Sequence, residues 1–266
     1  MKQVIFTADD FGLCPEVNEA VELGHTKGVL SAASLMVAAP WAADAVERAR
    51  RLPDLKVGLH LTLVDGTALL PPAEIPSLVD AAGTFSKNLA ASGVHWFFSS
   101  AARRDLRKEI RAQFEAFRAT GLALDHVNTH NHMHLHPTVL SMVLDLAREF
   151  AVPGIRLPSE PPNGLLAPWL ALMKSRLRNA GVKFNGTLVG LHASGHVTEA
   201  RVLSALDKLQ DGVTEFYFHP ATAATSLLEA NAPGYDRRGE LQALTSRPVA
   251  QRLSALGLKT IGFSGL

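Results

Sequence analysis

Five of the eleven histidines in this chain fall between residues 126 and 136. The even positions of that segment hold only histidine and asparagine: His126, Asn128, His130, His132, His134 and His136. In an extended strand these side chains would all lie on one face. Neutral imidazole is the commonest metal ligand in proteins and favours zinc, cobalt, nickel or iron over calcium. The segment therefore predicts a metal centre.

One ion cannot bind all five imidazoles, because six residues of extended strand span about 20 Å. At most two of the five histidines are expected to be ligands. A histidine-rich loop would have the same composition, and so would buried histidines that each bond a backbone carbonyl group. Both alternatives stay open for the segment.

A pair of acidic residues, Asp9 and Asp10, follows the short apolar run 4–7. Neighbouring side chains on a strand point to opposite faces, so both carboxylates share a pocket only if the chain turns there. The following Phe11-Gly12 indicates such a turn. Paired carboxylates that are buried need a positive charge beside them, and a divalent cation would provide it. A simple strand-ending turn is the alternative interpretation.

Two further histidines stand at positions where they could take part in binding or catalysis. In the run 57–63 the odd positions are valine and leucine, so His60 points away from the apolar face. His219 ends the strand-like run 214–219, and the mouth of a late strand suits a general acid. Taken alone, His60 is more simply interpreted as a buried structural histidine, and His219 fits either role.

Other polar residues near the predicted strand ends carry no such pattern. Asp65, Arg156, Glu160 and Asp236 show no spacing that sets them apart from ordinary surface residues. The single cysteine, Cys14, has no neighbouring base that would make it a nucleophile, so it is expected to be structural. One cysteine also excludes an internal disulfide and a multi-cysteine metal site.

The elements that must position these residues follow a β/α pattern, in which short runs of valine, isoleucine and leucine alternate with helical patterns. Strands are predicted at 4–7, 57–63, 124–135, 154–157, 184–191, 214–219 and 258–263, and 29–39 is expected to be strand or loop. Helices are predicted at 15–28, 106–117, 137–150, 198–209 and 249–256. We expect an α/β fold in which about seven parallel strands form a closed or nearly closed barrel, with function at their carboxyl ends. An open doubly wound sheet is the competing arrangement, although no glycine-rich nucleotide-binding motif is present.

The whole chain, 1–266, is expected to form a single domain with an insertion-like excursion at about 65–102. Hydrophobic residues make up 47% of the sequence and charged residues 19%, so the chain can bury a core and is too apolar to be disordered. The 26 basic and 25 acidic residues nearly cancel, which argues against nucleic-acid binding. No apolar run suits a membrane span or a signal peptide, so a cytoplasmic protein is expected.

Several of these motifs together resemble one known family. In order along the chain they are Thr7-Ala8-Asp9-Asp10-Phe11-Gly12, Gly58-Leu59-His60-Leu61-Thr62-Leu63, the histidine segment 126–134, Glu215-Phe216-Tyr217-Phe218-His219-Pro220 and the stretch 235–241. Their order and content, from residue 4 to about 245, resemble the YdjC-type carbohydrate deacetylases. Three further stretches, 15–21, 32–37 and 70–76, resemble the branch associated with hopanoid biosynthesis, often labelled HpnK.

The resemblance implies a distorted TIM-like β/α barrel that removes the acetyl group from an N-acetylglucosamine unit. One divalent metal ion, Mg²⁺ or Zn²⁺, is implied as the cofactor. The matching positions make Asp10, His60 and His130 the metal ligands. They make Asp9 the acid that activates water and His219 the donor of a proton to the leaving amine.

The sequence departs from the family pattern in three places. Asn128 replaces a usual aspartate, Asn131 replaces a histidine, and Ala221 replaces a glycine. The first two bear on how neighbouring groups orient the proposed ligands, and the third bears on the loop after His219. None of the three removes a proposed ligand.

The hopanoid branch implies a lipid that carries N-acetylglucosamine. The stretches 96–98 and 165–173 are apolar. They would form a lid or a patch that contacts the inner membrane peripherally. The alternative is that they belong to the hydrophobic core or to a homodimer interface. Two other functions stay open. One is a metal-dependent hydrolase of another ester or amide class, and the other is a non-catalytic metal- or sugar-binding protein.

Overall fold

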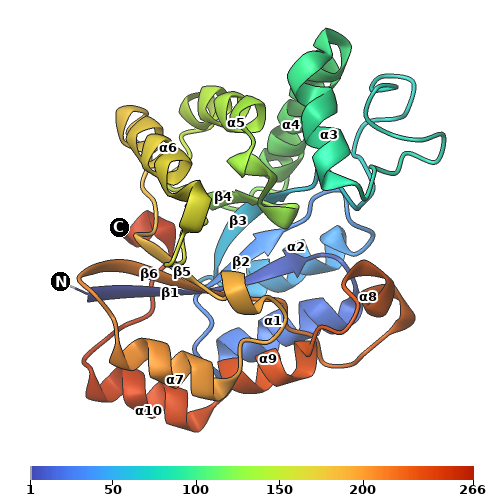
Figure 1. The fold of residues 1–266 in the computed structure, drawn as a ribbon. Coiled ribbons are helices and arrows are strands. Elements are labelled where there is room, and N and C mark those ends of the chain that lie inside the picture. The colour runs from blue at the N-terminus through green and yellow to red at the C-terminus, as the bar shows by residue number, and fades with distance from the viewer. Residues whose placement is uncertain (1) are drawn as a thin grey trace.

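Six parallel strands form the sheet that positions the site, in a computed structural model that describes residues 2–266 (Figure 1). The strands are β1 (Lys2–Phe11), β2 (Ala32–Leu35), β3 (Lys56–Leu61), β4 (Leu124–Thr129), β5 (Thr187–Val189) and β6 (Gly212–Phe218). Their order across the sheet is β4-β3-β2-β1-β6-β5. Every neighbouring pair is parallel, so the carboxyl ends of all six strands lie at one edge.

Ten α-helices cover the strands within the described range. They are α1 (Pro15–Lys27), α2 (Ala42–Arg51), α3 (Leu89–Phe98), α4 (Ser100–Ala119), α5 (Pro137–Glu149), α6 (Ala167–Asn179), α7 (Glu199–Asp207), α8 (Ser226–Asn231), α9 (Arg237–Leu244) and α10 (Arg247–Ala255). In Figure 1, α3 to α6 lie above the strands, and α1, α7, α9 and α10 lie below them. The predicted helices correspond to α1, α4, α5, α7 and α10; the other helices were not predicted.

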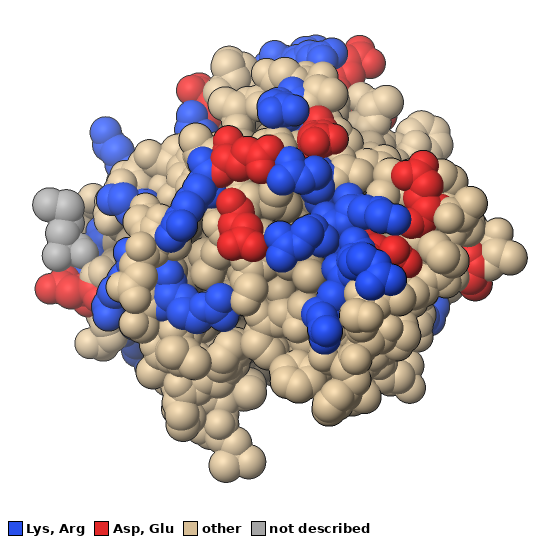
Figure 2. Space-filling model, turned by 90° about the horizontal axis from the view of Figure 1, so that it is seen from above, with Lys and Arg blue, Asp and Glu red and all other residues tan. Residues whose placement is uncertain are grey.

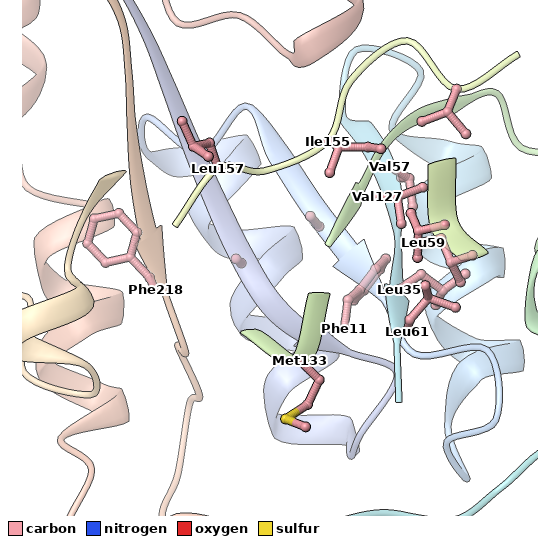
Figure 3. Close-up of a cluster of buried hydrophobic side chains, with 14 of the residues drawn as sticks. Phe11, Leu35, Val57, Leu59, Leu61, Val127, Met133, Ile155, Leu157 and Phe218 are labelled. Carbon is pink, nitrogen blue, oxygen red and sulfur yellow. The ribbon is translucent and has the colours of Figure 1, made fainter. Parts of the chain in front are cut away.

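The strand β3 shows how alternation in the sequence sorts the side chains. Val57, Leu59 and Leu61 are buried in the main hydrophobic core. They form a row beside Leu35 of the neighbouring strand (Figure 3). His60 is also buried, but its ring contacts polar groups on the opposite side of the strand, as the alternation predicts.

The prediction of about seven strands in a closed barrel is not confirmed. The segment 154–157 makes only isolated parallel bridges, from Ile155 to β4 and from Gly154 to Lys183. The side chain of Asn185 bonds both the backbone N–H and the C=O of Leu157, so these groups are not available to a ladder. The segment 258–263 likewise contributes one isolated bridge, to β1. The result is a curled six-stranded sheet.

The segment 65–102 contributes no strand to the sheet; it contains α3, and its last three residues begin α4. Ala68, Ile75 and Phe85 form a small hydrophobic cluster of its own. Two carboxylates of α4 hold the segment in place. Glu109 accepts hydrogen bonds from the backbone N–H groups of 69 and 70, and Asp105 accepts from the backbone N–H of residue 77.

Charged side chains crowd the outer surface of the helices above the sheet, where basic and acidic groups interleave (Figure 2). Between α4 and α5, Arg111 pairs with Glu149 at 2.6 Å and Arg107 pairs with Asp145 at 3.2 Å. These exposed ion pairs contribute little to stability. Among the described helices, none is both long enough and apolar enough to cross a membrane.

The carboxyl group of Asp125 ties the C-terminal segment to β4. Its Oδ2 accepts hydrogen bonds from the backbone N–H of Phe263 and from His126 Nδ1, and its Oδ1 accepts from Ser264. Burial alone would raise the pKa of Asp125, but the hydrogen bonds from His126 and Ser264 outweigh it and lower the pKa to about 2. The ionised carboxylate therefore stabilises the folded chain.

The substitution Asp125→Asn should lower the free energy of unfolding by about 2 kcal/mol at pH 7. The stabilisation is fully present above the ordinary pKa of 3.8 and is lost as the pH falls toward about 2. The gap between wild type and variant should therefore narrow below pH 4. Urea unfolding at pH 7, 5 and 3.5 measures the gap, with the exposed Asp54→Asn as control. Equal stabilities at pH 7 would contradict this account.

Candidate active site

The carboxyl ends of the strands enclose a cavity of about 250 Å³. The predicted site residues all line it: Asp9, Asp10, His60, His130 and His219. The strand β1 supplies the two acids and β3 supplies His60, while His130 and His219 directly follow β4 and β6. Parallel β/α folds place functional residues at this edge.

Asp10 has a backbone φ of 63°, in the left-handed region that residues other than glycine rarely adopt. This conformation interrupts the alternation of β1, so Asp9 and Asp10 both reach the cavity instead of opposite faces. The turn indicated by the sequence is present, because the backbone N–H of Leu13 bonds the carbonyl of Asp10. Such a conformation costs about 1–3 kcal/mol and is typical of functional positions.

Asp10, His60 and His130 bring three donor atoms to one point. Asp10 Oδ1 lies 3.3 Å from His130 Nδ1 and 3.7 Å from His60 Nε2, and the two nitrogens lie 3.4 Å apart. Atoms at these separations surround a point about 2.0 Å from each of them, which is the length of a zinc-nitrogen or zinc-oxygen bond. We call these three residues the ligand triangle; all three are buried.

The chemistry of the ligand triangle also fits a divalent cation. Asp10 Oδ1 is buried and accepts no hydrogen bond from any residue between 2 and 266. Burial works to raise the pKa of Asp10, but the adjacent His130 and Arg237 hold it well below its usual range. Against the effect of burial, Asp10 in turn raises the pKa of His130. The pocket thus favours positive charge, and its two imidazoles favour a transition metal.

Asn128 of β4 fixes how His60 faces the ligand triangle. Asn128 Oδ1 accepts a hydrogen bond of 2.7 Å from His60 Nδ1, which leaves His60 Nε2 able to bind a cation. Asn128 Nδ2 donates to Asp9 Oδ1 at 3.0 Å and to Ser34 Oγ at 2.9 Å. Because Nδ2 faces two acceptors, the orientation of the amide follows from its neighbours.

A chain of buried hydrogen bonds continues from Asn128 away from the cavity. Ser34 Oγ donates to His126 Nε2 at 2.9 Å, and His126 Nδ1 donates to Asp125 Oδ2 at 2.9 Å. The ring of His126 also stacks on Phe263, with 4.9 Å between centroids. Both ring nitrogens of His126 are therefore occupied, and this histidine is structural.

Arg156 binds Asp9. The side chain of Arg156 is 0% exposed, so the expectation that Arg156 is an ordinary surface residue is wrong. Arg156 Nη1 and Nη2 donate to the two oxygens of Asp9, and Nε and Nη2 donate to Glu215 Oε1 at 3.0 and 2.8 Å. Burial works to raise the pKa of Asp9, but Arg156 holds it far below its usual range. Asp9 is therefore ionised at neutral pH and carries no proton of its own.

Arg237, at the start of α9, is the second guanidinium at the site. Its Nη1 and Nη2 each lie 3.3 Å from Asp10 Oδ2, and Nη2 donates to Asn231 Oδ1 at 2.9 Å. No role was predicted for Arg237 from the sequence, although the residue lies in the stretch 235–241 that carries the family resemblance. Together the two arginines occupy every oxygen of the acid pair except Asp10 Oδ1, which faces the imidazoles.

His219 lies between the rings of Tyr217 and Tyr235, with centroid distances of 5.3 and 5.1 Å. Its backbone N–H donates to Glu240, and its Nδ1 is buried without a hydrogen-bond partner. Burial lowers the pKa of His219 to about 4, so the ring is neutral at pH 7. Burial likewise raises the pKa of Glu240 to about 7.

Comparison with known proteins identifies the family: the family described as YdjC-like protein matches residues 3–255. The chain belongs to this family. A carbohydrate deacetylase from Brevibacillus brevis is 30% identical over 99% of each chain, and one from Vibrio vulnificus (strain CMCP6) is 32% identical over 99% of this chain and 96% of its own. A crystal structure from Enterococcus faecalis V583, provisionally described as a cellobiose-phosphate cleavage protein, has a TM-score of 0.82 and 27% identity over 99% of this chain and 98% of its own.

The departures from the YdjC-type pattern have definite places in the structure. Asn128 Nδ2 donates one hydrogen bond to Asp9 Oδ1, which an ionised aspartate at this position could not do. Asn131 adopts a φ of 53° and lines the cavity. Ala221 is fully buried, and its backbone N–H donates to the carbonyl of Arg237.

The strand predicted at 124–135 ends at Thr129, and the prediction that its even positions share one face is wrong beyond that point. Asn131 and His132 both have positive φ, at 53° and 52°, so the chain coils into a short 3-10 segment, His130–Leu135. Of the five clustered histidines, only His130 belongs to the ligand triangle.

The other histidines of the segment have separate surroundings. His132 lines the cavity beside Tyr217. His134 is buried and bonds the hydroxyl of Thr129 and the carbonyl of residue 156. His136 packs edge-on against Trp96 of α3.

The remaining polar positions divide between the cavity and the loops. Asp65 lines the cavity. Glu160 accepts a hydrogen bond from the backbone N–H of residue 192, and Asp236 caps α9 by accepting from the backbone N–H of residue 239. Cys14 is buried, and burial raises the pKa of its thiol to about 11, in agreement with a structural role.

The substitution Gly58→Ala should lower the free energy of unfolding by about 1–3 kcal/mol. A Cβ atom at Gly58 would lie 2.5 Å from the His126 ring, which must then leave its hydrogen bond to Ser34. Urea unfolding measures the loss. Gly24→Ala in α1 is the control, because its added Cβ meets no atom closer than 3.4 Å and favours the helix. A Gly58→Ala protein as stable as wild type would contradict the tight packing at His126.

Proposed function

We propose that this protein is a metal-dependent hydrolase that removes the acetyl group from an N-acetylglucosamine unit. The ligand triangle is the observation that carries the proposal, because one buried carboxylate and two imidazoles converge on a point with room for further ligands. Two further findings support it: relatives named carbohydrate deacetylases align with nearly the whole chain, and the cavity above the triangle is lined by polar and aromatic side chains.

In this proposal Asp10, His60 and His130 hold one divalent cation, which when bound polarises the acetyl carbonyl and lowers the pKa of a water molecule. Asp9 accepts a proton from that water. Its Oδ2 accepts a hydrogen bond only from Arg156, so one lone-pair position stays open to the proton.

Protein groups also direct the departure of the amine. His219 donates a proton to the amide nitrogen as the C–N bond breaks, and the products are acetate and a free amine. Because the ring of His219 is neutral in the folded protein, the proton that it gives to the amine would be the one that the attacking water releases to Asp9. Arg156 and Asn128 hold Asp9 in place, so the base keeps one position while charge moves.

Another class of reaction is distinguished by its product. The Enterococcus faecalis structure carries a provisional description as a cellobiose-phosphate cleavage protein, which is a different chemistry on a similar fold. Release of acetate from N-acetylglucosamine conjugates supports deacetylation, whereas release of phosphate supports the other class. A protein that binds the cation and the sugar without turnover would be a binding protein.

Replacement of His130 and of His219 should separate binding from chemistry. We expect His130→Ala to lose both the bound cation and turnover, because it removes one corner of the ligand triangle. His219→Ala should keep the cation and lose about 10²–10⁴-fold in kcat. Metal content after dialysis and acetate release from an N-acetylglucosamine conjugate measure the two effects. A chelator should abolish turnover of wild type, and Zn²⁺ or Mg²⁺ should restore it. A His130→Ala protein with full metal content and full rate would refute the assignment.

We further propose that the acetylated sugar is carried by a lipid of the hopanoid type, reached at the membrane surface. The stretches 15–21, 32–37 and 70–76 support the branch, and exposed apolar side chains support the contact. Trp96 is buried, but Phe98 at the end of α3 is 77% exposed and Leu165 is fully exposed. Phe97 and Leu166 are also exposed beside them.

A lipid contact at α3 predicts that Phe98→Glu weakens binding to phospholipid vesicles at least tenfold. Cosedimentation with vesicles measures it, and Leu256→Glu, at another exposed leucine, is the control. Wild type that does not bind vesicles would contradict the membrane contact. A dimer that Phe98→Glu dissociates would instead assign these side chains to a homodimer interface.

A further inference from the structure

Glu240, in the first turn of α9, is a buried carboxyl group that no step of the proposed reaction uses. Only 1% of its surface is exposed. Its Oε2 accepts a hydrogen bond from the backbone N–H of His219, and its Oε1 accepts one from the backbone N–H of Val197 at 3.0 Å. One carboxyl group therefore joins the segment after β6 to the loop that follows β5.

A second residue of α9 holds the other side of the His219 backbone. Arg237 Nη1 lies 3.4 Å from the carbonyl oxygen of His219, and the carbonyl of Arg237 accepts a hydrogen bond from the backbone N–H of Ala221. The same guanidinium group contacts Asp10 Oδ2. The first turn of α9 thus ties both the N–H and the C=O of His219 to a corner of the ligand triangle.

The His219 ring is placed by packing and by the backbone that carries it. Its Nδ1 is buried without a hydrogen-bond partner in residues 2–266, and the ring lies between Tyr217 and Tyr235. A Cβ atom at Gly195 would lie 2.2 Å from the Tyr235 ring, so the loop after β5 packs tightly behind that ring. A shift of the backbone at His219 would therefore move the ring directly.

We propose that Glu240 is a positioning residue for the proton donor, and that it fixes the backbone of His219 so that the ring faces the amide nitrogen of the substrate. This inference rests on the proposed deacetylation, in which His219 protonates the leaving amine. Proton transfer needs the donor within about 3 Å of the nitrogen, and small misplacements are costly. Glutamine cannot replace Glu240, because its amide group would set an N–H against one of the two backbone N–H donors.

Two leaving groups of different basicity separate the placement of the donor from general damage. An amine must be protonated as it leaves, whereas the 4-nitrophenolate of 4-nitrophenyl acetate leaves without a proton. We expect Glu240→Gln to lower kcat for an N-acetylglucosamine conjugate at least tenfold, with KM unchanged. The chelator-sensitive kcat for 4-nitrophenyl acetate should change less than twofold. Assays at pH 8 keep Glu240 ionised in wild type, since burial raises its pKa only to about 7.

Glu109→Gln in α4 is the matched control. Glu109 is also a fully buried glutamate whose two oxygens accept backbone N–H groups, those of residues 69 and 70, but it holds the segment after β3 instead of His219. This variant should keep the wild-type ratio of amide to ester hydrolysis. In a His219→Ala background, Glu240→Gln should lower the amide rate no further, because the donor is already gone.

Amide hydrogen exchange gives a readout without turnover. Glu240→Gln should accelerate exchange of the backbone N–H groups of His219 and Val197 at least tenfold, and Glu109→Gln should not. If Glu240→Gln does not fold, Glu240→Asp, which keeps both acceptor oxygens on a shorter side chain, should lower the amide-to-ester ratio about threefold.

Equal losses for the amide and the ester would overturn the inference and leave deacetylation intact. A further tenfold loss in the His219→Ala background, or unchanged exchange at His219, would overturn it as well. If wild type releases no acetate from the conjugate, the proposed function fails, and hydrogen exchange still decides whether Glu240 holds His219.

Discussion

The negative charge of Asp9 and Asp10 is the constraint on which the rest of the site depends. Two adjacent carboxylates are buried at the end of β1, and both keep a low pKa, so positive groups must surround them. Arg156 binds Asp9, and Arg237 binds one oxygen of Asp10. Glu215 shares Arg156, so the three carboxyl groups of Asp9, Asp10 and Glu215 meet only two guanidinium groups. The oxygen left over, Asp10 Oδ1, is the one that faces two imidazoles.

Buried hydrogen bonds inside the curled sheet hold the residues around these two carboxylates in position. Asn128 donates to Ser34, Ser34 donates to His126, and His126 donates to Asp125, so the chain of hydrogen bonds has one direction. Asn128 also orients His60 and Asp9. A buried network of this kind is rigid when every member has a partner. The same bonds therefore stabilise the C-terminal segment and orient His60 toward the cavity.

Local patterns in the sequence predicted the parts of the site that local structure determines. Alternation along β3 placed His60 correctly, and Asp10 lies in the turn that Phe11-Gly12 indicated. The histidine segment does not alternate beyond Thr129 because Asn131 and His132 have positive φ angles. No glycine marks these positions, so the turn has no sign in the sequence. Arg156 and Arg237 were missed because each meets its carboxylate across 147 and 227 residues of chain, and no local spacing reports such a contact. The strand predicted at 154–157 does not join the sheet, because the side chain of Asn185 bonds the backbone N–H and C=O of Leu157.

Anomalous scattering from crystals of the wild-type protein grown with Co²⁺ or Zn²⁺ tests the central claim most directly. The account predicts one strong peak, about 2.0–2.2 Å from Asp10 Oδ1, His60 Nε2 and His130 Nδ1 together. A peak held by other side chains, or no peak in the cavity at millimolar cation, would contradict it.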